Sequence, residues 1–204
     1  MAHRIFILSP AHCGGERAQL VFNEQAQFPL ARQLRRRPGV PLGELFSFLS
    51  GLYFRGKLAY AQAFAAPPPG VPGVLIITAN EGLRSPSFPV TLARLRRYAR
   101  GSIDLQDARY CRPLMRDARI VAAAAGPECE VVLLGSVATG KYVDLLLKVF
   151  GPALRFPAEF AGRGDMSRGG LLLRCVDAGR ELEYVGLEGA RRHGSRPPRL
   201  APRA

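Results

Sequence analysis

Residues 4–10 read Arg-Ile-Phe-Ile-Leu-Ser-Pro, a short apolar run that stops at a polar turn. A continuous apolar run of this length, bounded by turn residues, is typical of a strand that is buried on both faces. Residues 74–78 (VLIIT) and 130–134 (EVVLL) have the same form. Strands of this kind indicate a parallel sheet that is covered by helices on both sides. The sequence therefore predicts an α/β fold, a mostly parallel three-layer α/β/α sandwich.

Helical periodicity fills the segments between these runs, because apolar residues recur there at spacings of three and four. Gly51 and Gly56 interrupt the longest such segment, which leaves open whether it is one helix or two. A fourth strand is predicted at 154–160. The pattern at 171–176 fits either a helix or a hairpin with 181–185. The predicted helices cover residues 28–37, 41–64, 90–100, 107–125 and 141–150.

The composition is that of one globular domain. The chain has 204 residues, of which 48% are hydrophobic and 22% are charged, and a chain of this size buries roughly 70% of the surface that it exposes when unfolded. We expect a single α/β domain over 1–190. Residues 191–204 (RRHGSRPPRLAPRA) are rich in Arg and Pro, which predicts a disordered basic tail that acts as an electrostatic arm.

The cysteines and the hydropathy pattern indicate a cytoplasmic protein. The four cysteines are far apart, and none forms a Cys-x-x-Cys pair or has a histidine at ligand spacing, so neither a disulfide framework nor a metal site is expected. The chain has no secretory signal pattern and no run of 18 apolar residues. We therefore expect no membrane span, no metal and no other cofactor.

The charge balance suggests a phosphate-bearing partner. Lys and Arg together number 29 against 16 Asp and Glu, which gives a net charge of +13. Lysine occurs only at positions 57, 141 and 148, so nearly all of this charge is guanidinium. Arginine binds phosphate through two hydrogen bonds and stacks on bases, which favours nucleic acid as a partner. The alternative is that a GC-rich genome raises the arginine content without any functional meaning.

Ligands of parallel α/β sheets bind at the carboxyl ends of the strands, which here are the loops that begin at Ser9, Ala79, Gly135 and Ala161. The third loop matches the phosphate-loop spacing G-x-x-x-x-G-K, but Tyr142 replaces the Ser or Thr that binds Mg²⁺. Ser136 and Lys141 are therefore predicted to contact a phosphate or the DNA backbone, without nucleotide hydrolysis. An ordinary turn between a strand and a helix is the alternative.

The loop at 162–170 (GRGDMSRGG) carries the strongest local signal. Asp165 and Ser167 are residues that cap helices, and the glycines together with Arg163 and Arg168 would let a phosphate polymer approach the backbone closely. The alternative is a capped helix whose arginines are solvated.

The loops after the first two strands offer further polar groups. In 9–17, Glu16 could activate a water while Arg17 holds a phosphate, although Glu16 could equally cap the next helix. A Cys13 nucleophile is disfavoured, because residues adjacent in sequence, such as His12 and Cys13, seldom point at each other. Asn80 and Glu81 could read a base edge or form a tight turn. Tyr53 or Phe54 could stack on a base.

Several of these segments together resemble a known family. The Ser-Pro turn followed by Cys13, the stretch 52–61 (LYFRGKLAYA), the strand followed by Glu81-Gly82-Leu83 and the late Gly-Arg-Gly run resemble an uncharacterised family of small prokaryotic Rossmann-like domains. That family is similar in plan to the uracil-DNA-glycosylase-like superfamily, and the likeness covers most of residues 4–175. The chain lacks the Gly-Gln-Asp-Pro-Tyr-His and His-Pro-Ser-Pro strings of the best-known members.

The resemblance implies a function and a placement of the site. The loop at 9–17 would carry the water-activating group, and the loop at 161–170 would insert into DNA. The chain is also similar to small bacterial anti-phage DNA glycosylases, which implies excision of glucosylated hydroxymethylcytosine from double-stranded phage DNA to leave abasic sites. This chemistry needs no metal and no nucleotide cofactor.

The sequence thus predicts a DNA glycosylase that needs no protein partner. Its alternatives are a nucleic-acid-binding module without catalysis and a nucleotide-handling enzyme that uses the loop at 135–141. Two carboxylates are expected to activate water and to stabilise the oxocarbenium ion, and other polar groups to hold the base or the phosphates. The catalytic candidates are Glu16 and Asp165; the base-contacting candidates are Ser9, His12, Asn80 and Glu81; the phosphate-binding candidates are Arg17, Ser136, Lys141, Arg163, Ser167 and Arg168.

Overall fold

The computed structural model describes residues 3–138, 140–190 and 194, and within them a six-stranded sheet forms the centre of the fold. The strand order is β4-β3-β1-β6-β7-β8. The four inner strands are parallel, and the two edge strands pair antiparallel to their neighbours. The strands are β1 (Arg4–Leu8), β3 (Val74–Ile77), β4 (Leu83–Arg84), β6 (Glu130–Leu134), β7 (Leu154–Pro157) and β8 (Tyr184–Gly186). The prediction of a mostly parallel α/β sheet is confirmed.

Strand β1 lies in the middle of the sheet because its side chains are apolar on both faces. Residues Ile5–Leu8 are buried, and β1 pairs with β6 from Arg4 opposite Glu130 to Leu8 opposite Leu134. On its other side it pairs with β3, where Phe6 lies opposite Val74. The chain runs from β1 to β3 on one side and later returns to β6 on the other. The loops after β1 and β6 therefore meet at the topological switch point of the sheet, where ligands bind in folds of this kind.

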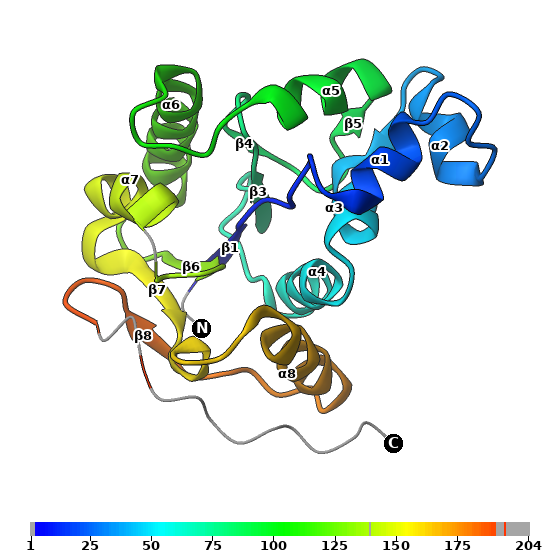
Figure 1. Ribbon diagram of the computed structural model, residues 1–204. Helices are drawn as coiled ribbons and strands as arrows, with labels where there is room; N and C mark the ends of the chain where they lie inside the picture. The colour runs from blue at the N-terminus through cyan, green and yellow to red at the C-terminus, as the bar shows by residue number, and fades with distance from the viewer. Residues whose placement is uncertain (1–2, 139, 191–193, 195–204) are drawn as a thin grey trace.

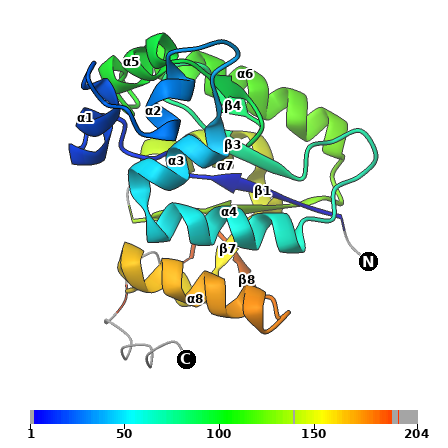
Figure 2. The ribbon, with the colours of Figure 1, turned by 90° about the vertical axis from the view of Figure 1, so that its right-hand side faces the viewer.

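Helices cover both faces of the sheet, which makes three layers (Figure 1). Helices α4 and α8 pack together on one face, and α6 and α7 pack together on the other. In the turned view, α1, α3 and α5 lie toward the end to which β1 points, as Figure 2 shows. The helices are α1 (Glu16–Phe22), α2 (Pro29–Leu34), α3 (Leu42–Ser50), α4 (Leu52–Phe64), α5 (Leu92–Arg100), α6 (Ala108–Ala125), α7 (Gly140–Phe150) and α8 (Asp165–Asp177).

The structure decides the segments that the sequence left open. Gly51 has a φ of +60°, a conformation that glycine adopts without strain, and it separates α3 from α4. Gly56 lies inside α4 and does not interrupt the helix. Residues 171–176 belong to helix α8, so the hairpin alternative is wrong, and β8 pairs with β7 instead.

Several elements differ from the prediction. The helix predicted at 28–37 ends at Leu34, and the one predicted at 90–100 begins at Leu92. The loop after β1 ends at Gly15 instead of Arg17, because Glu16 already begins α1, a helix that was not predicted. The strand predicted at 154–160 ends at Pro157 and continues as a 3₁₀ turn, Ala158–Phe160. A two-residue antiparallel ribbon, β2 (Val40–Pro41) with β5 (Pro89–Val90), joins α3 to α5 and was not predicted.

In the described part of the chain, no helix combines the length and the apolar character that crossing a membrane requires. The tail predicted at 191–204 lies, apart from Gly194, outside the described residues.

Candidate functional site

A pocket of about 340 Å³ lies at the switch point, beside the carboxyl ends of β1 and β6. This volume is within the range of sites for small ligands. The loop after β1 forms one wall, from Ser9 to Gly14, and a second wall is contributed by Ser136, Lys141 and Tyr142. Helices α3, α4, α5 and α8 also reach it, through Phe46, Lys57, Tyr98 and Asp165. The pocket thus draws on the sheet edge that the parallel topology marks for ligands.

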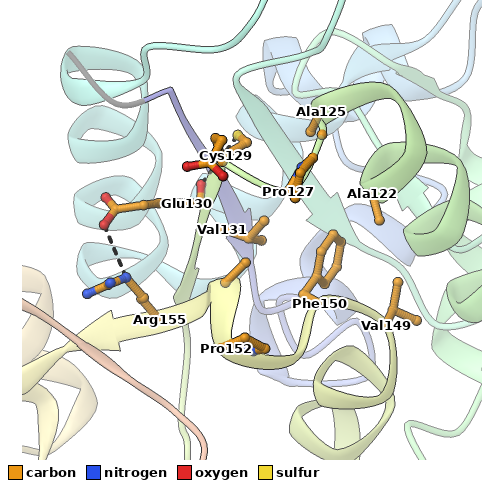
Figure 3. A pocket seen from close by; sticks show the side chains of 13 residues that line it. Ala122, Ala125, Pro127, Cys129, Glu130, Val131, Val149, Phe150, Pro152 and Arg155 are labelled. Atoms are coloured by element: carbon orange, nitrogen blue, oxygen red, sulfur yellow. Dashed lines mark hydrogen bonds and ion pairs between the residues drawn. The ribbon is translucent and has the colours of Figure 1, made fainter.

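A larger hollow of about 730 Å³ lies at the opposite end of the strands, where β6 begins (Figure 3). Its walls are mostly apolar, from Ala122 and Ala125 of α6 to Phe150 and Pro152 at the end of α7. Of its three charged residues, Glu130 and Arg155 are paired with each other at 3.1 Å, and Glu128 is exposed. Functional sites combine apolar walls with several polar groups that converge on a ligand, and the smaller pocket at the switch point has more of these groups, so it is the better candidate.

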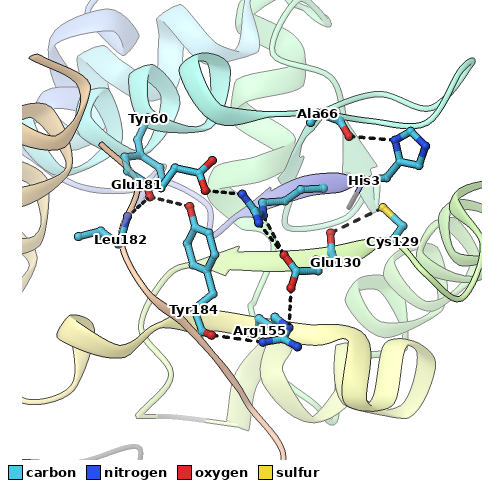
Figure 4. Close-up of polar contacts among 10 residues, drawn as sticks. His3, Tyr60, Ala66, Cys129, Glu130, Arg155, Glu181, Leu182 and Tyr184 are labelled. Atoms are coloured by element: carbon cyan, nitrogen blue, oxygen red, sulfur yellow. Dashed lines mark hydrogen bonds and ion pairs between the residues drawn. The ribbon is translucent and has the colours of Figure 1, made fainter. Parts of the chain in front are cut away.

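An ionic cluster stabilises this end of the sheet, where β1 and β6 begin (Figure 4). The Arg4 side chain donates to Glu130 at 2.7 Å and also pairs with Glu181, and Glu130 pairs with Arg155 as well. The hydroxyl groups of Tyr60 and Tyr184 lie 2.5 Å apart, which ties α4 to β8. These contacts join β1, β6 and β7 to β8 and α4, which indicates a structural role.

We expect Glu130→Gln to lower the free energy of unfolding by about 2 kcal/mol, because it leaves two partly buried guanidinium groups without their shared carboxylate. Chemical denaturation monitored by circular dichroism measures this. The change should leave activity in the folded protein intact, since the cluster lies at the other end of the strands from the pocket. The matched control is Glu188→Gln, which makes the same change from carboxylate to carboxamide at an exposed residue just after β8. Equal stability of Glu130→Gln and the wild type would contradict the role of the cluster.

Ser9 and Lys57 form the floor of the candidate pocket. Ser9 ends β1 in a buried position, and Lys57 of α4 is only 1% exposed. The Lys57 ammonium donates to the Ser9 carbonyl at 2.7 Å and to the Ser9 hydroxyl at 2.8 Å. Burial lowers the pKa of Lys57 to about 7; Asp165 acts against this shift and Arg168 adds to it. The pocket therefore contains an amine that is partly neutral near physiological pH.

The loop that matches the phosphate-loop spacing contributes a hydroxyl group rather than a metal ligand. The Tyr142 hydroxyl donates to the Ser136 carbonyl at 2.8 Å, across the turn between β6 and α7. A Cβ on Gly135 would lie 2.7 Å from the Ser9 Cβ and 2.9 Å from the Tyr142 hydroxyl oxygen. Glycine at 135 is thus what lets the two loops of the switch point come together. Ser136 and Lys141 both line the pocket, and their contact with a phosphate stays a prediction.

The first turn of α8 brings a carboxylate to the pocket. Asp165 is the first residue of α8 and its side chain is 65% exposed, whereas the Arg168 side chain, one turn later, is only 8% exposed. Arg168 donates to the Phe160 carbonyl at 2.9 Å and to the Asp165 carboxylate at 3.3 Å. A buried, doubly anchored guanidinium therefore holds the carboxylate from behind. The prediction that Arg168 contacts phosphate is not supported, because the Arg168 side chain is buried and its guanidinium is bound to groups of the protein.

Close packing of α4 against α8 places Lys57 near Asp165. A Cβ on Gly56 would lie 2.7 Å from the Gly169 carbonyl oxygen, and one on Gly169 would lie 2.8 Å from backbone atoms of Leu52 and Tyr53. Both helices therefore need glycine where they cross. The glycines near Arg168 were predicted to let a phosphate polymer approach the backbone. For Gly169, the backbone that approaches is that of α4.

Aromatic side chains complete the pocket. Tyr53, Phe46 and Tyr98 line it, and the Tyr53 ring lies 4.6 Å from the Lys57 ammonium. The Tyr53 hydroxyl is buried and has no hydrogen-bond partner among the described residues. A buried hydroxyl without a hydrogen-bond partner costs free energy, and the nearby Arg168 guanidinium offsets part of this cost.

The structure brings together five of the predicted site residues and leaves the others apart. Those that line the pocket are Ser9, His12, Ser136, Lys141 and Asp165. Those that are not among its lining residues are Glu16, Arg17, Asn80, Glu81, Arg163, Ser167 and Arg168.

Glu16 and Arg17 belong to the exposed first turn of α1. The Arg17 guanidinium donates to the Phe48 carbonyl at 3.0 Å and packs on Gly51, so it supports α3. The expected convergence of Glu16 with Asp165 is therefore not found, and Asp165 is the carboxylate of the pocket. Arg163 donates to the Ser167 hydroxyl at 3.1 Å, and neither Ser167 nor Asp165 caps α8, whose N-cap is Gly164.

The two residues predicted to read a base belong to a neighbouring network. Glu81 accepts hydrogen bonds from Arg94, Arg97 and the Tyr98 hydroxyl. Burial alone would raise the pKa of Glu81, but these three donors lower it. The Asn80 amide donates to the Arg97 carbonyl at 2.9 Å, in a small recess beside the pocket. Both side chains thus fix α5, which supplies Tyr98 to the pocket wall.

Cys13 lines the pocket but is not a reactive thiol. Burial raises its pKa to about 12, and its sulfur lies 3.5 Å from the Ala11 carbonyl oxygen. This supports the argument against a cysteine nucleophile.

Lys57 is the main residue that the sequence analysis missed. It shares one helical face with Tyr53, Phe54, Tyr60 and Ala61, all of which are buried. A lysine on the apolar face of a helix is uncommon, and it is one of only three lysines in the chain. These two facts together could have identified Lys57 as a candidate functional residue from the sequence.

Exposed arginines lie close to the pocket on α5 and at the start of α6. Arg97, Arg100 and Arg109 line the recess that adjoins the pocket and shares Ala79 and Gly101 with it. These cations were not among the predicted phosphate contacts, although an arginine-rich helix is a recognisable signal for binding a polyanion. Lys141 adds a further exposed cation at the pocket itself.

Comparison of the chain with protein-family models, with curated proteins and with solved structures gives no match in any of the three.

Proposed function

We propose that this protein is a DNA glycosylase that excises a modified base from double-stranded phage DNA and leaves an abasic site. The observation that carries the proposal is one pocket at the sheet's switch point, in which the Asp165 carboxylate, the Ser9 hydroxyl and aromatic rings share a space with exposed cations nearby. An enzyme that excises bases must admit an everted nucleotide and hold the distorted backbone. Cleavage of the N-glycosidic bond then needs a carboxylate at the sugar.

The roles follow from the positions of the residues. Phe46, Tyr53 and Tyr98 offer apolar surface to a base that has left the helix. Asp165 orients the attacking water or stabilises the positive charge that develops on the sugar. Arg168 is a positioning residue, since it holds Asp165 and is too buried to contact DNA. Lys141 and Arg100 supply phosphate contacts.

Met166 fits the part of the proposal that concerns insertion into DNA. It follows Asp165 in the first turn of α8 and is 67% exposed, although its side chain is large and apolar. Proteins that extrude a base or kink DNA often insert a residue of this kind between bases. The neighbouring carboxylate would then face the deoxyribose of the everted nucleotide.

The proposal is tested by incubating the protein with phage DNA that carries modified bases, and with unmodified DNA, followed by alkaline cleavage at abasic sites. We expect breakage of the modified DNA only. Asp165→Asn should lower the excision rate by about 100-fold or more, because the amide cannot activate water or stabilise a cation. Its DNA affinity should stay within about threefold of the wild type, since no phosphate contact is removed.

The matched control is Asp177→Asn, the same chemical change at the last residue of the same helix, which should leave the excision rate unchanged. Failure to break any modified DNA would overturn the proposal. If DNA is bound with steep salt dependence but never broken, the protein is a binding module without catalysis. If DNA binding is weak and only free nucleotides are altered, the loop at 135–141 belongs to an enzyme for small substrates.

A further inference from the structure

Lys57 is chemically unlike the other lysines of the chain. Lys141 and Lys148 are exposed on α7, whereas Lys57 is 1% exposed and lines the pocket from α4. An aliphatic amine removed from water loses most of the stabilisation of its charged form. The environment therefore favours the neutral amine, which is the nucleophilic form of lysine.

The charged groups around Lys57 come from α8. The Asp165 carboxylate favours the protonated amine, and the Arg168 guanidinium disfavours it. Asp165 is 65% exposed and already paired with Arg168, so the electrostatic compensation that reaches Lys57 is incomplete. A lysine in a desolvated site beside another cation is the arrangement found in lysines that react with carbonyl groups.

The hydrogen bonds of Lys57 leave room for the loss of a proton. An ammonium group has three donor hydrogens, and two of them go to the carbonyl and the hydroxyl of Ser9. The third has no hydrogen-bond acceptor among the described residues, and the Tyr53 and Phe54 rings lie 4.6 and 4.8 Å from the nitrogen. Loss of that third proton therefore breaks none of these hydrogen bonds. Ser9 meanwhile keeps the nitrogen fixed at the wall of the pocket.

We propose that Lys57 is the nucleophilic amine of this pocket and condenses with the C1′ aldehyde of an abasic deoxyribose, which makes the protein an abasic-site lyase as well as a glycosylase. This inference rests on the proposed function, because base excision supplies the aldehyde. It differs from that function in requiring a covalent bond between the protein and DNA. The partner is the ring-opened sugar that the excision step leaves in the same pocket.

The chemistry is balanced without any oxidant or reductant. The Lys57 amine adds to the aldehyde, and loss of water gives an imine. A proton leaves C2′ for a base, and the Asp165 carboxylate, which lines the same pocket, is the group available for this step. The C3′–O3′ bond then breaks, and the 3′-phosphate-linked strand leaves with the electron pair. Water hydrolyses the remaining imine and returns the free amine.

The test uses the full chain and a synthetic duplex that already contains one abasic site. Sodium borohydride reduces an imine to a stable amine, so a covalent complex is expected on a denaturing gel. The chain has only three lysines, and peptide mapping can therefore locate the adduct directly in the wild-type protein. We expect it on Lys57. Lys57→Met and Lys57→Arg should lower the trapped complex by at least about 100-fold, and Lys148→Arg should leave it unchanged.

Each outcome decides the question. An adduct on Lys141, Lys148 or the α-amino group overturns the inference, and so does the absence of any trapped complex with the wild type. If alkali reveals abasic sites in modified phage DNA but no complex is trapped, the glycosylase proposal stands and the lyase inference fails. If the preformed abasic site is trapped at Lys57 but no base is excised, the reverse holds. Mapping on the wild type keeps the test valid even if a Lys57 variant does not fold.

Discussion

Gly169→Val is expected to lower the free energy of unfolding by about 3 kcal/mol or more and to abolish excision in the fraction that remains folded. The Cβ of any residue at 169 would lie 2.8 Å from the Leu52 carbonyl oxygen and from the Tyr53 Cα. Both are backbone atoms of α4, so neither can move aside by a rotamer change. Relief requires the helices to separate, which opens the most extensively packed pair of helices in the fold.

The effect on activity has a specific cause. Gly169 directly follows Arg168, which anchors Asp165, and it packs against Gly56, which directly precedes Lys57. Separation of α4 from α8 therefore moves the carboxylate away from the amine, and small misplacements of reacting groups cost large factors in rate. Chemical denaturation gives the stability, and the alkaline cleavage assay gives the activity.

The matched control is Gly186→Val on edge strand β8, where an added Cβ meets nothing within 4 Å and φ is not positive. Valine suits a strand, so this variant should be as stable as the wild type. Gly56→Ala tests the same crossing from the other helix and should destabilise the protein as well. If Gly169→Val were as stable as Gly186→Val, the close approach of α4 to α8 would be contradicted.

The sequence was sufficient for the four parallel strands because the information there is local, whereas the short antiparallel edge strand β4 was not predicted. The apolar runs at 4–8, 74–78 and 130–134 each carry their own signal, and parallel pairing follows from the helices between them. The break at Gly51 and the helix at 171–176 were left open, because glycine inside a helical pattern has several meanings. Only the packing of α4 on α8 shows that Gly56 and Gly169 serve close approach.

The site was only partly predictable, because its residues come together through tertiary packing. The rule for strand ends located Ser9, Ser136 and Lys141, since Ser9 directly follows β1 and the other two belong to the connection from β6 into the first turn of α7. It placed Glu16 with them as well, although α1 carries that side chain away from the pocket. Lys57 could not be found by the rule, because it reaches the pocket from the side of a helix that covers the sheet.

Lys57→Met is expected to change the pH dependence of stability. The pKa of Lys57 is lowered by burial to about 7 in the folded protein, from an ordinary value of 10.5. Between these two pH values the unfolded chain binds a proton that the folded chain does not, so this group makes the wild type more stable as the pH rises from about 7 to 10. Below pH 7 both states bind the proton, and the full cost of burying the charge is present. Methionine has a similar length and bears no charge.

The difference between the two proteins should therefore change sign. At pH 6 we expect Lys57→Met to be more stable than the wild type by about 2 kcal/mol, because the buried charge is removed. At pH 10 the wild type should be the more stable, because its amine is neutral and keeps its hydrogen bonds to Ser9, each worth about 1 kcal/mol. The Asp165 carboxylate, the Arg168 guanidinium and the Tyr53 ring all act on the charged amine, and Lys57→Met removes these interactions together with the charge. Denaturation curves from pH 6 to 10 measure it, with Lys148→Met as the exposed control. A difference that stays constant over this range would mean that Lys57 keeps its proton in the folded state, and a permanently charged amine could not attack an aldehyde.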